Sequence, residues 1–134
     1  QSADIRKFET LGTRSFAPEQ AIGQAIDFHN AIGSQRKAQR LHFLKNYWCE
    51  KVVTNPRVRL NVSLNPQFSC ALGNFSIEGM EPETVANRLM GEFQIHTVAI
   101  KWENISGVRV TPHVYTTTRD LDRFVEAVLK IAAS

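Results

Sequence analysis

Apolar residues recur every three to four positions along the first third of the chain, the spacing of an amphipathic helix. Pro18 suits the first turn of a helix whose apolar face runs from Ala21 to Ile32, and Gly33 ends it. Ser34 then caps a second helix. The apolar stripe of this second helix consists of Leu41, Leu44, Trp48 and Val52. The pattern predicts an N-terminal helical hairpin that ends near residues 54–56.

After the hairpin the period of the apolar positions changes to two, which is typical of half-buried strands. The predicted strands cover residues 58–64, 69–78, 96–102 and 108–115. A helix over 82–93 follows the second strand, and a turn around 104–107 joins the last two. The final helix begins at Thr117, which with Asp120 can form a capping box. The order ββαββα after the hairpin predicts an α+β fold with an antiparallel-rich sheet covered by helices on one face.

One arginine interrupts the last predicted strand. Alternation along a strand places Val108, Val110 and Val114 on one face and Arg109, Thr111, His113 and Tyr115 on the other. The valine face is the core side, and the other face is either wetted surface or the wall of a site. An arginine on the polar face of a strand is most often a solvated surface residue. The pattern therefore assigns Arg109 to a face and leaves its role open.

Composition narrows the classes of function. At 134 residues with 43% hydrophobic and 22% charged content, the chain fits one ordered globular domain. A net charge of +3 is mildly basic, and the positive residues lie among acidic ones, so nucleic acid is not an expected partner. No apolar run is long enough to cross a bilayer, which argues against a membrane partner. A small anionic ligand such as a carboxylate or phosphate suits this charge balance.

The residue types that support catalysis or metal binding show no recognisable arrangement. Cys49 and Cys70 are far apart in sequence and form no Cys/His cluster, so we expect no metal site and two half-buried free thiols in a reducing compartment. Of the four histidines, His96 and His113 are better placed for a site than the two in the hairpin, yet no nucleophile motif accompanies them. We therefore assign no catalytic residue within this chain.

A small turn precedes the first predicted helix. Gly12, Thr13, Arg14 and Ser15 supply hydroxyl and backbone N–H groups of the kind that can hold a phosphate. The turn matches no complete P-loop and begins several residues before the helix, so an ordinary N-terminal turn is the better interpretation of these residues alone. Both interpretations stay open at this point.

Two segments at opposite ends of the chain resemble one enzyme family. "IRKFETLGTRSFAPEQAIGQAIDFHNAIG" and "GVRVTPHVYTTTRDLDRFVEAV" are similar to segments of the class V aminotransferases. These are fold-type-I pyridoxal-phosphate enzymes that include cysteine desulfurases and isopenicillin N epimerase-like proteins. The resemblance covers essentially the whole chain, as the C-terminal portion of such an enzyme. It implies that residues 1–56 connect to a large domain outside this chain and that residues 57–134 form the small C-terminal domain.

The family pattern also implies roles for individual residues. Thr13, with Gly12 beside it, would contact the phosphate of pyridoxal 5'-phosphate, typically in the site of the neighbouring subunit of a homodimer. Arg109 would bind the carboxylate of an amino-acid-type substrate, for which a guanidinium offers two parallel charge-assisted hydrogen bonds. The Schiff-base lysine of the family lies upstream of the segment that begins this chain at Gln1. The isolated chain is therefore expected to be inactive.

The resemblance leaves the reaction open between transamination, epimerisation and elimination. Desulfurases carry an Arg-x-Gly-x-x-Cys loop before the last strand, and residues 92–108 contain no cysteine, which favours the epimerase-like or aminotransferase-like branch. A cytoplasmic location is expected, although a targeting signal upstream of Gln1 would be invisible. The alternative is a stand-alone, non-catalytic α+β module that binds a small anionic ligand or a protein partner. That alternative explains the missing lysine without a larger parent.

Overall fold

The computed structural model describes residues 3–8, 12 and 15–134. It divides into two compact units, Gln1–Ser34 and Gln35–Ser134. In the first unit a 3-10 helix, η1 (Ile5–Phe8), precedes the helix α1 (Ala17–Ile32). Pro18 lies in the first turn of α1 and Gly33 follows its last residue, as the sequence predicts. No residue of α1 is buried.

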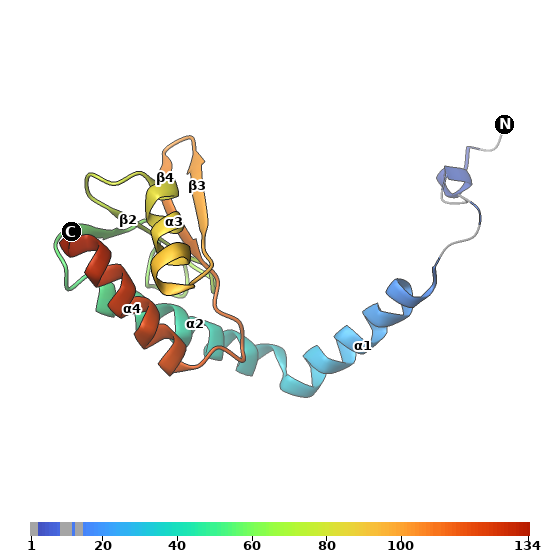
Figure 1. Cartoon of the computed structure of the whole chain (residues 1–134). Coiled ribbons are helices and arrows are strands. Elements are labelled where there is room, and N and C mark those ends of the chain that lie inside the picture. The colour runs from blue at the N-terminus through green and yellow to red at the C-terminus, as the bar shows by residue number, and fades with distance from the viewer. Residues whose placement is uncertain (1–2, 9–11, 13–14) are drawn as a thin grey trace. The chain divides into compact units, whose positions relative to one another are not determined.

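The second unit contains three helices and one sheet (Figure 1). Its elements in chain order are α2 (Ser34–Val52), β1 (Val58–Leu60), β2 (Gly73–Ile77), α3 (Pro82–Phe93), β3 (Val98–Trp102), β4 (Ile105–Val110) and α4 (Thr118–Ala133). The strands lie in the order β1-β2-β4-β3, and all three neighbouring pairs are antiparallel. The prediction of an α+β fold with an antiparallel sheet is therefore confirmed.

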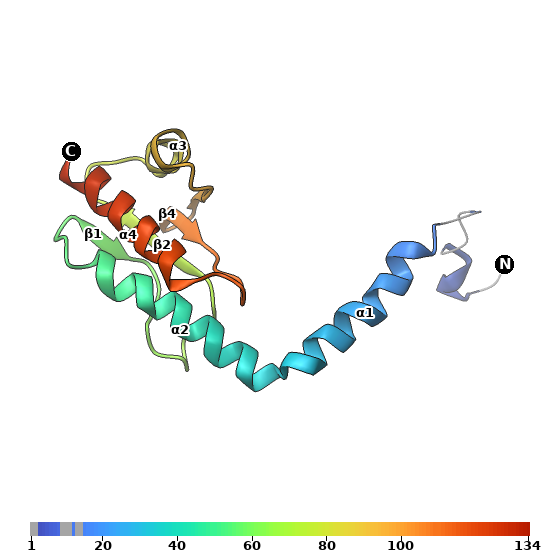
Figure 2. The same ribbon diagram turned by 60° about the horizontal axis from the view of Figure 1, so that its bottom comes forward.

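All three helices of this unit contribute to a core on one face of the sheet, and Figure 2 shows α2 and α4 running side by side across that face. Trp48 of α2, Phe75 of β2 and Phe124 of α4 meet edge to face at its centre, with ring centroids 5.4 to 6.0 Å apart. The predicted stripe of α2 supplies Leu44 and Val52 to the same core. Burial of these apolar side chains is the main force that joins the helices to the sheet.

Three of the predicted strands are too long. The strand predicted to reach Tyr115 ends at Val110. Pro112 has no N–H to donate to a ladder, and the chain then turns so that the Thr116 amide donates to the His113 carbonyl at 2.9 Å. The strand predicted over 58–64 ends at Leu60, and the one predicted from Ser69 begins at Gly73. The intervening loop is held by Lys45, which is fully buried and donates to the Ser63 carbonyl at 2.8 Å and the Ser69 hydroxyl at 2.6 Å.

Four further expectations need correction or stay open. Gly107, predicted to lie in a turn, is a buried residue inside β4. The cysteines are not both half-buried, because Cys49 is buried and Cys70 is exposed in the loop before β2; both thiols are free. The division at residues 56 and 57 and the packing of α1 against α2 as a hairpin remain predictions. Among the described residues, no helix has the length and apolar character needed to cross a membrane.

Candidate functional site

Arg109 lies on the face of the sheet opposite the helical core. It belongs to β4, one of the two inner strands, where Val108 and Val110 are 1% and 9% exposed while Arg109 itself is exposed. Its cross-strand partners are Asn74 on β2 and Val98 on β3. Directly paired residues of an antiparallel ladder share a face. The guanidinium therefore stands between an amide side chain and an aliphatic one.

The Arg109 guanidinium is available to a ligand. Across the part of the chain that the structure describes, it makes no hydrogen bond, salt bridge or cation–π contact. By contrast, Arg40 donates to the Thr116 carbonyl at 3.0 Å, and Arg57 donates to the Ala132 carbonyl at 2.7 Å. Those two arginines hold the fold together. Arg109 has the exposure and the unused donors that recognition of a carboxylate requires.

An amide network that the sequence does not predict lies beside Arg109. The Asn61 side-chain nitrogen donates to the Asn74 side-chain oxygen at 2.7 Å and to the Ser106 carbonyl at 3.2 Å. Asn74 is 8% exposed. Gly107 leaves the room for both amides, because a Cβ there would lie 2.2 Å from the Asn74 oxygen and 2.7 Å from the Asn61 nitrogen. No local motif announces this cluster, since its members come from three segments far apart in sequence.

The predicted phosphate-binding residues lie in the first unit. Gly12 is exposed and has a φ of +88°, the left-handed region that favours glycine. Its neighbour Thr13 lies outside the described residues. The assignment of Gly12 and Thr13 to a cofactor phosphate therefore remains a prediction from the family resemblance.

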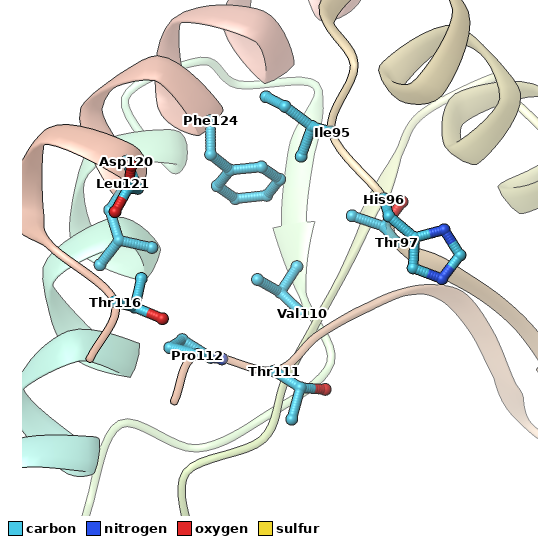
Figure 3. A pocket seen from close by; sticks show the side chains of 10 residues that line it. All are labelled: Ile95, His96, Thr97, Val110, Thr111, Pro112, Thr116, Asp120, Leu121 and Phe124. Carbon is cyan, nitrogen blue, oxygen red and sulfur yellow. The ribbon is translucent and has the colours of Figure 1, made fainter. Parts of the chain in front are cut away.

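A cavity of about 170 Å³ lies on the other side of β4 (Figure 3). Its walls come from the segment before β3, from the end of β4 and the loop after it, and from the first two turns of α4. Figure 3 shows the His96 ring across the cavity from Asp120 and Leu121. Val110 points into it, whereas Arg109 does not line it. No lysine or arginine lines the cavity, and its one carboxylate, Asp120, caps α4. It is therefore a poor candidate for binding an anion.

The remaining candidates from the sequence do not form a catalytic or metal centre. His113 stacks on Tyr115 with ring centroids 4.4 Å apart, in the turn after β4, and not on the strand face predicted for them. Among residues 3–8, 12 and 15–134, no three His, Cys, Asp or Glu side chains come together as a metal site would require. Burial raises the pKa of the Cys49 thiol to about 12, which disfavours the nucleophilic thiolate.

Four of the lysines have engaged ammonium groups. Lys45 is buried against the loop between β1 and β2, as described above. Lys51, Lys101 and Lys130 form ion pairs with Asp122, Glu81 and Glu126 at 2.5, 3.0 and 2.8 Å. Lys101 donates a hydrogen bond to the Glu81 carboxylate, which raises the pKa of Lys101, and Lys51 donates to the Asp122 carboxylate, which raises the pKa of Lys51. A raised pKa is the opposite of what a nucleophilic amine needs.

The fold is shared with parts of known enzymes. An alanine–glyoxylate aminotransferase from Nostoc sp. superimposes on 81% of this chain with a TM-score of 0.64 and 20% identity. An apo cysteine desulfurase from Thermococcus onnurineus NA1 also covers 81% of the chain, with a TM-score of 0.70 and 20% identity. The chain spans 29% of either structure. These are the aminotransferase and desulfurase folds that the two sequence segments indicated.

The sequence comparison points in the same direction. Isopenicillin N epimerase from Amycolatopsis lactamdurans is 25% identical over 129 residues, which is 96% of this chain and 32% of that protein. No model of a known protein family matches the chain. The resemblance of this chain to class V aminotransferase-type enzymes, among them an isopenicillin N epimerase, is thus confirmed. The chain corresponds to about a third of the length of its relatives.

Proposed function

We propose that this chain is the C-terminal portion of a pyridoxal-phosphate-dependent enzyme that acts on an amino acid or a related amine. The observation that carries the proposal is the match of nearly the whole chain to a third of an isopenicillin N epimerase. The exposed, unpartnered Arg109 on the sheet face opposite the core supports it, because the resemblance assigns carboxylate binding to this arginine and its guanidinium donors are unused. The parent would be a homodimer, as the family resemblance implies.

In this function Arg109 anchors the substrate. Two parallel N–H groups of a guanidinium grip a carboxylate and fix its orientation as well as its affinity. Pyridoxal phosphate, when bound, supplies the electron sink for the bond-breaking step. Anchoring the carboxylate helps to decide which bond at the substrate α-carbon aligns with that sink. Gly12, in its left-handed turn, and Thr13 would hold the cofactor phosphate.

The surroundings of four lysines are consistent with a Schiff-base lysine that lies outside this chain, in a larger parent enzyme. Lys45 has no access to a ligand, and the ammonium groups of Lys51, Lys101 and Lys130 are ion-paired. Each is poorly suited to form a Schiff base with the cofactor. This supports the hypothesis that the Schiff-base lysine belongs to another segment of the parent enzyme.

The exposed apolar residues of the first unit also fit a larger parent. Ile22 and Ile26, from the predicted apolar face of α1, are 61% and 52% exposed, and Phe28 is 60% exposed. Apolar side chains that share a helix and stay uncovered mark an interaction surface. A large domain of the parent enzyme would cover them.

The proposal is tested on the full-length parent and on this chain in parallel. Each is incubated with pyridoxal phosphate, reduced with borohydride and analysed by peptide mass spectrometry. We expect one stoichiometric modified lysine in the parent, outside residues 1–134, and no stoichiometric adduct in the isolated chain. A natural gene product that ends at about this length, or a parent that binds no cofactor, would instead support a stand-alone anion-binding module.

A further inference from the structure

The amide network beside Arg109 has a fixed polarity. The Ser106 carbonyl can only accept a hydrogen bond, so the Asn61 side chain must turn its nitrogen toward the network. That nitrogen also donates to Asn74, which must therefore present its side-chain oxygen to Asn61. The amide nitrogen of Asn74 is left over. One backbone carbonyl on β4 thus determines which end of the Asn74 amide is free.

The free nitrogen of Asn74 is accessible. Within the described part of the chain this nitrogen has no hydrogen-bond partner. The fully buried side-chain atoms without a partner are in His42, Asn46, Trp48 and Thr97. The Asn74 nitrogen is not one of them, so it is not fully buried. The Asn74 oxygen lies over Gly107, where a Cβ would approach it to 2.2 Å. The nitrogen is on the other side of the planar amide, turned away from Gly107. Across the ladder from Asn74 stands Arg109.

We propose that Asn74 is a second carboxylate-binding residue, which donates an N–H to the same anionic group that Arg109 binds. Paired residues in an antiparallel ladder have Cβ atoms about 5 Å apart, so both side chains can reach one carboxylate. Asn61 and Gly107 are positioning residues, because the first orients the Asn74 amide and the second leaves space for it. The identification of the anion as an amino-acid substrate rests on the proposed function. The proposal that Arg109 and Asn74 share one carboxylate does not depend on it.

The Asn74 amide is well suited to this task because it is neutral and held in place. Only 8% of the Asn74 surface is exposed. The side chain is therefore already ordered and loses little conformational entropy when a ligand binds. An aspartate of the same shape would place a carboxylate opposite Arg109 and neutralise it. An asparagine adds a donor and leaves the arginine charge for the ligand.

The test is a titration of the 134-residue chain with sodium acetate against sodium chloride at equal ionic strength, followed by NMR of side-chain N–H groups. We expect the Arg109 Nε–H and the Asn74 Nδ2–H₂ signals to shift with one common dissociation constant. Asn74→Ala should weaken acetate binding at Arg109 about threefold to tenfold, the effect of one lost hydrogen bond. Asn74→Asp should abolish it at pH 7.

Ser76 offers the matched controls. It lies two residues along β2 on the same face, where its ladder partner is Arg59 instead of Arg109. Ser76→Ala should leave the dissociation constant unchanged, and Ser76→Asp should reduce affinity far less than Asn74→Asp. The ¹H–¹⁵N spectrum of each variant confirms that it is folded. The shift of the Asn74 signals in the unsubstituted chain measures acetate binding at Asn74 without any substitution.

Either of two results would overturn the inference: acetate shifts Arg109 with the same dissociation constant in Asn74→Ala, or acetate shifts neither side chain. A second arm uses the cofactor-loaded parent, where Asn74→Ala should raise KM for its amino-acid substrate with kcat nearly unchanged. A parent that binds no pyridoxal phosphate would refute the proposed function while the acetate result stands. An active parent whose KM ignores Asn74 would refute this inference alone.

Discussion

The indole of Trp48 occupies the space where a side chain on Gly73 would stand. A Cβ at Gly73 would lie 2.1 Å from Cζ2 of Trp48 and 2.9 Å from its Cη2. The indole cannot yield easily, because it is fully buried and meets Phe75 and Phe124 edge to face. The first residue of β2 is thus a glycine because α2 packs directly onto the sheet there.

Gly73→Ala is therefore expected to destabilise the chain by about 1 to 3 kcal/mol through overpacking. Urea unfolding followed by tryptophan fluorescence measures the change. Gly91→Ala is the matched control, because a Cβ there has no neighbour within 4 Å and alanine favours the helix α3. Equal stability of the two variants would show that α2 does not pack onto β2 as described.

The two thiols should react very differently. Iodoacetamide at pH 8 is expected to modify exposed Cys70 readily and to leave Cys49 unmodified until the chain unfolds. Burial raises the pKa of Cys49 to about 12, against about 8.5 in an unfolded chain. The stability that this shift contributes is complete below pH 8.5 and is lost as the pH rises toward 12.

Peptide mass spectrometry after timed alkylation identifies the modified thiol. A Cys70→Ser variant should show no labelling while folded and one label per chain in denaturant. Rapid labelling of Cys49 in that folded variant would contradict the packing of α2 against the sheet.

The start of α4 rests on a reciprocal capping box. The Thr117 hydroxyl accepts from the Asp120 amide at 3.2 Å, and the Thr117 amide donates to the Asp120 carboxylate at 2.9 Å. Thr117→Val keeps the shape and removes the hydroxyl, so we expect a loss of about 1 kcal/mol in the free energy of unfolding. Thr118→Val, one residue into the helix, should cost much less.

The same cap predicts a pH dependence. The hydrogen bonds from the Thr117 hydroxyl and backbone N–H lower the pKa of Asp120 below its ordinary value. The resulting stabilisation is present above about pH 4 and is lost as the pH falls through the lowered pKa. Asp120→Asn should therefore be less stable than the unsubstituted chain at pH 7, with the difference shrinking below pH 4. Thermal unfolding across this range measures it, and a constant difference would count against the cap.

In the full-length parent, Arg109→Ala should raise KM for a carboxylated substrate about tenfold to a hundredfold, because a charge-assisted pair is lost. The visible absorption of the bound cofactor should stay unchanged. Arg59→Ala is the control, since Arg59 is exposed on the same sheet face and pairs with Ser76 in the ladder. Unchanged steady-state kinetics in Arg109→Ala would remove this arginine from the substrate site.

Short-range patterns were sufficient for much of this fold. The box between Thr117 and Asp120 and the start of α3 at Pro82 depend on residues within one turn, so the sequence predicts them correctly. Alternation along β4 also places Arg109 opposite the core before any partner strand is known. In each case the physical cause acts between neighbours along the chain.

Only the tertiary structure decided where the strands end and what stands beside Arg109. Strand ends depend on partners: Tyr115 lies beyond β4 because no strand pairs with that segment, despite its alternating pattern. The Asn61 amide, just after β1, bonds to groups 13 and 45 residues away, on β2 and β4. The sequence pattern predicts Gly107 in a turn. In the sheet, its missing side chain leaves the space that the Asn61 and Asn74 amides occupy. Contacts between distant segments produce no periodic pattern in a single sequence, so only the folded structure shows them.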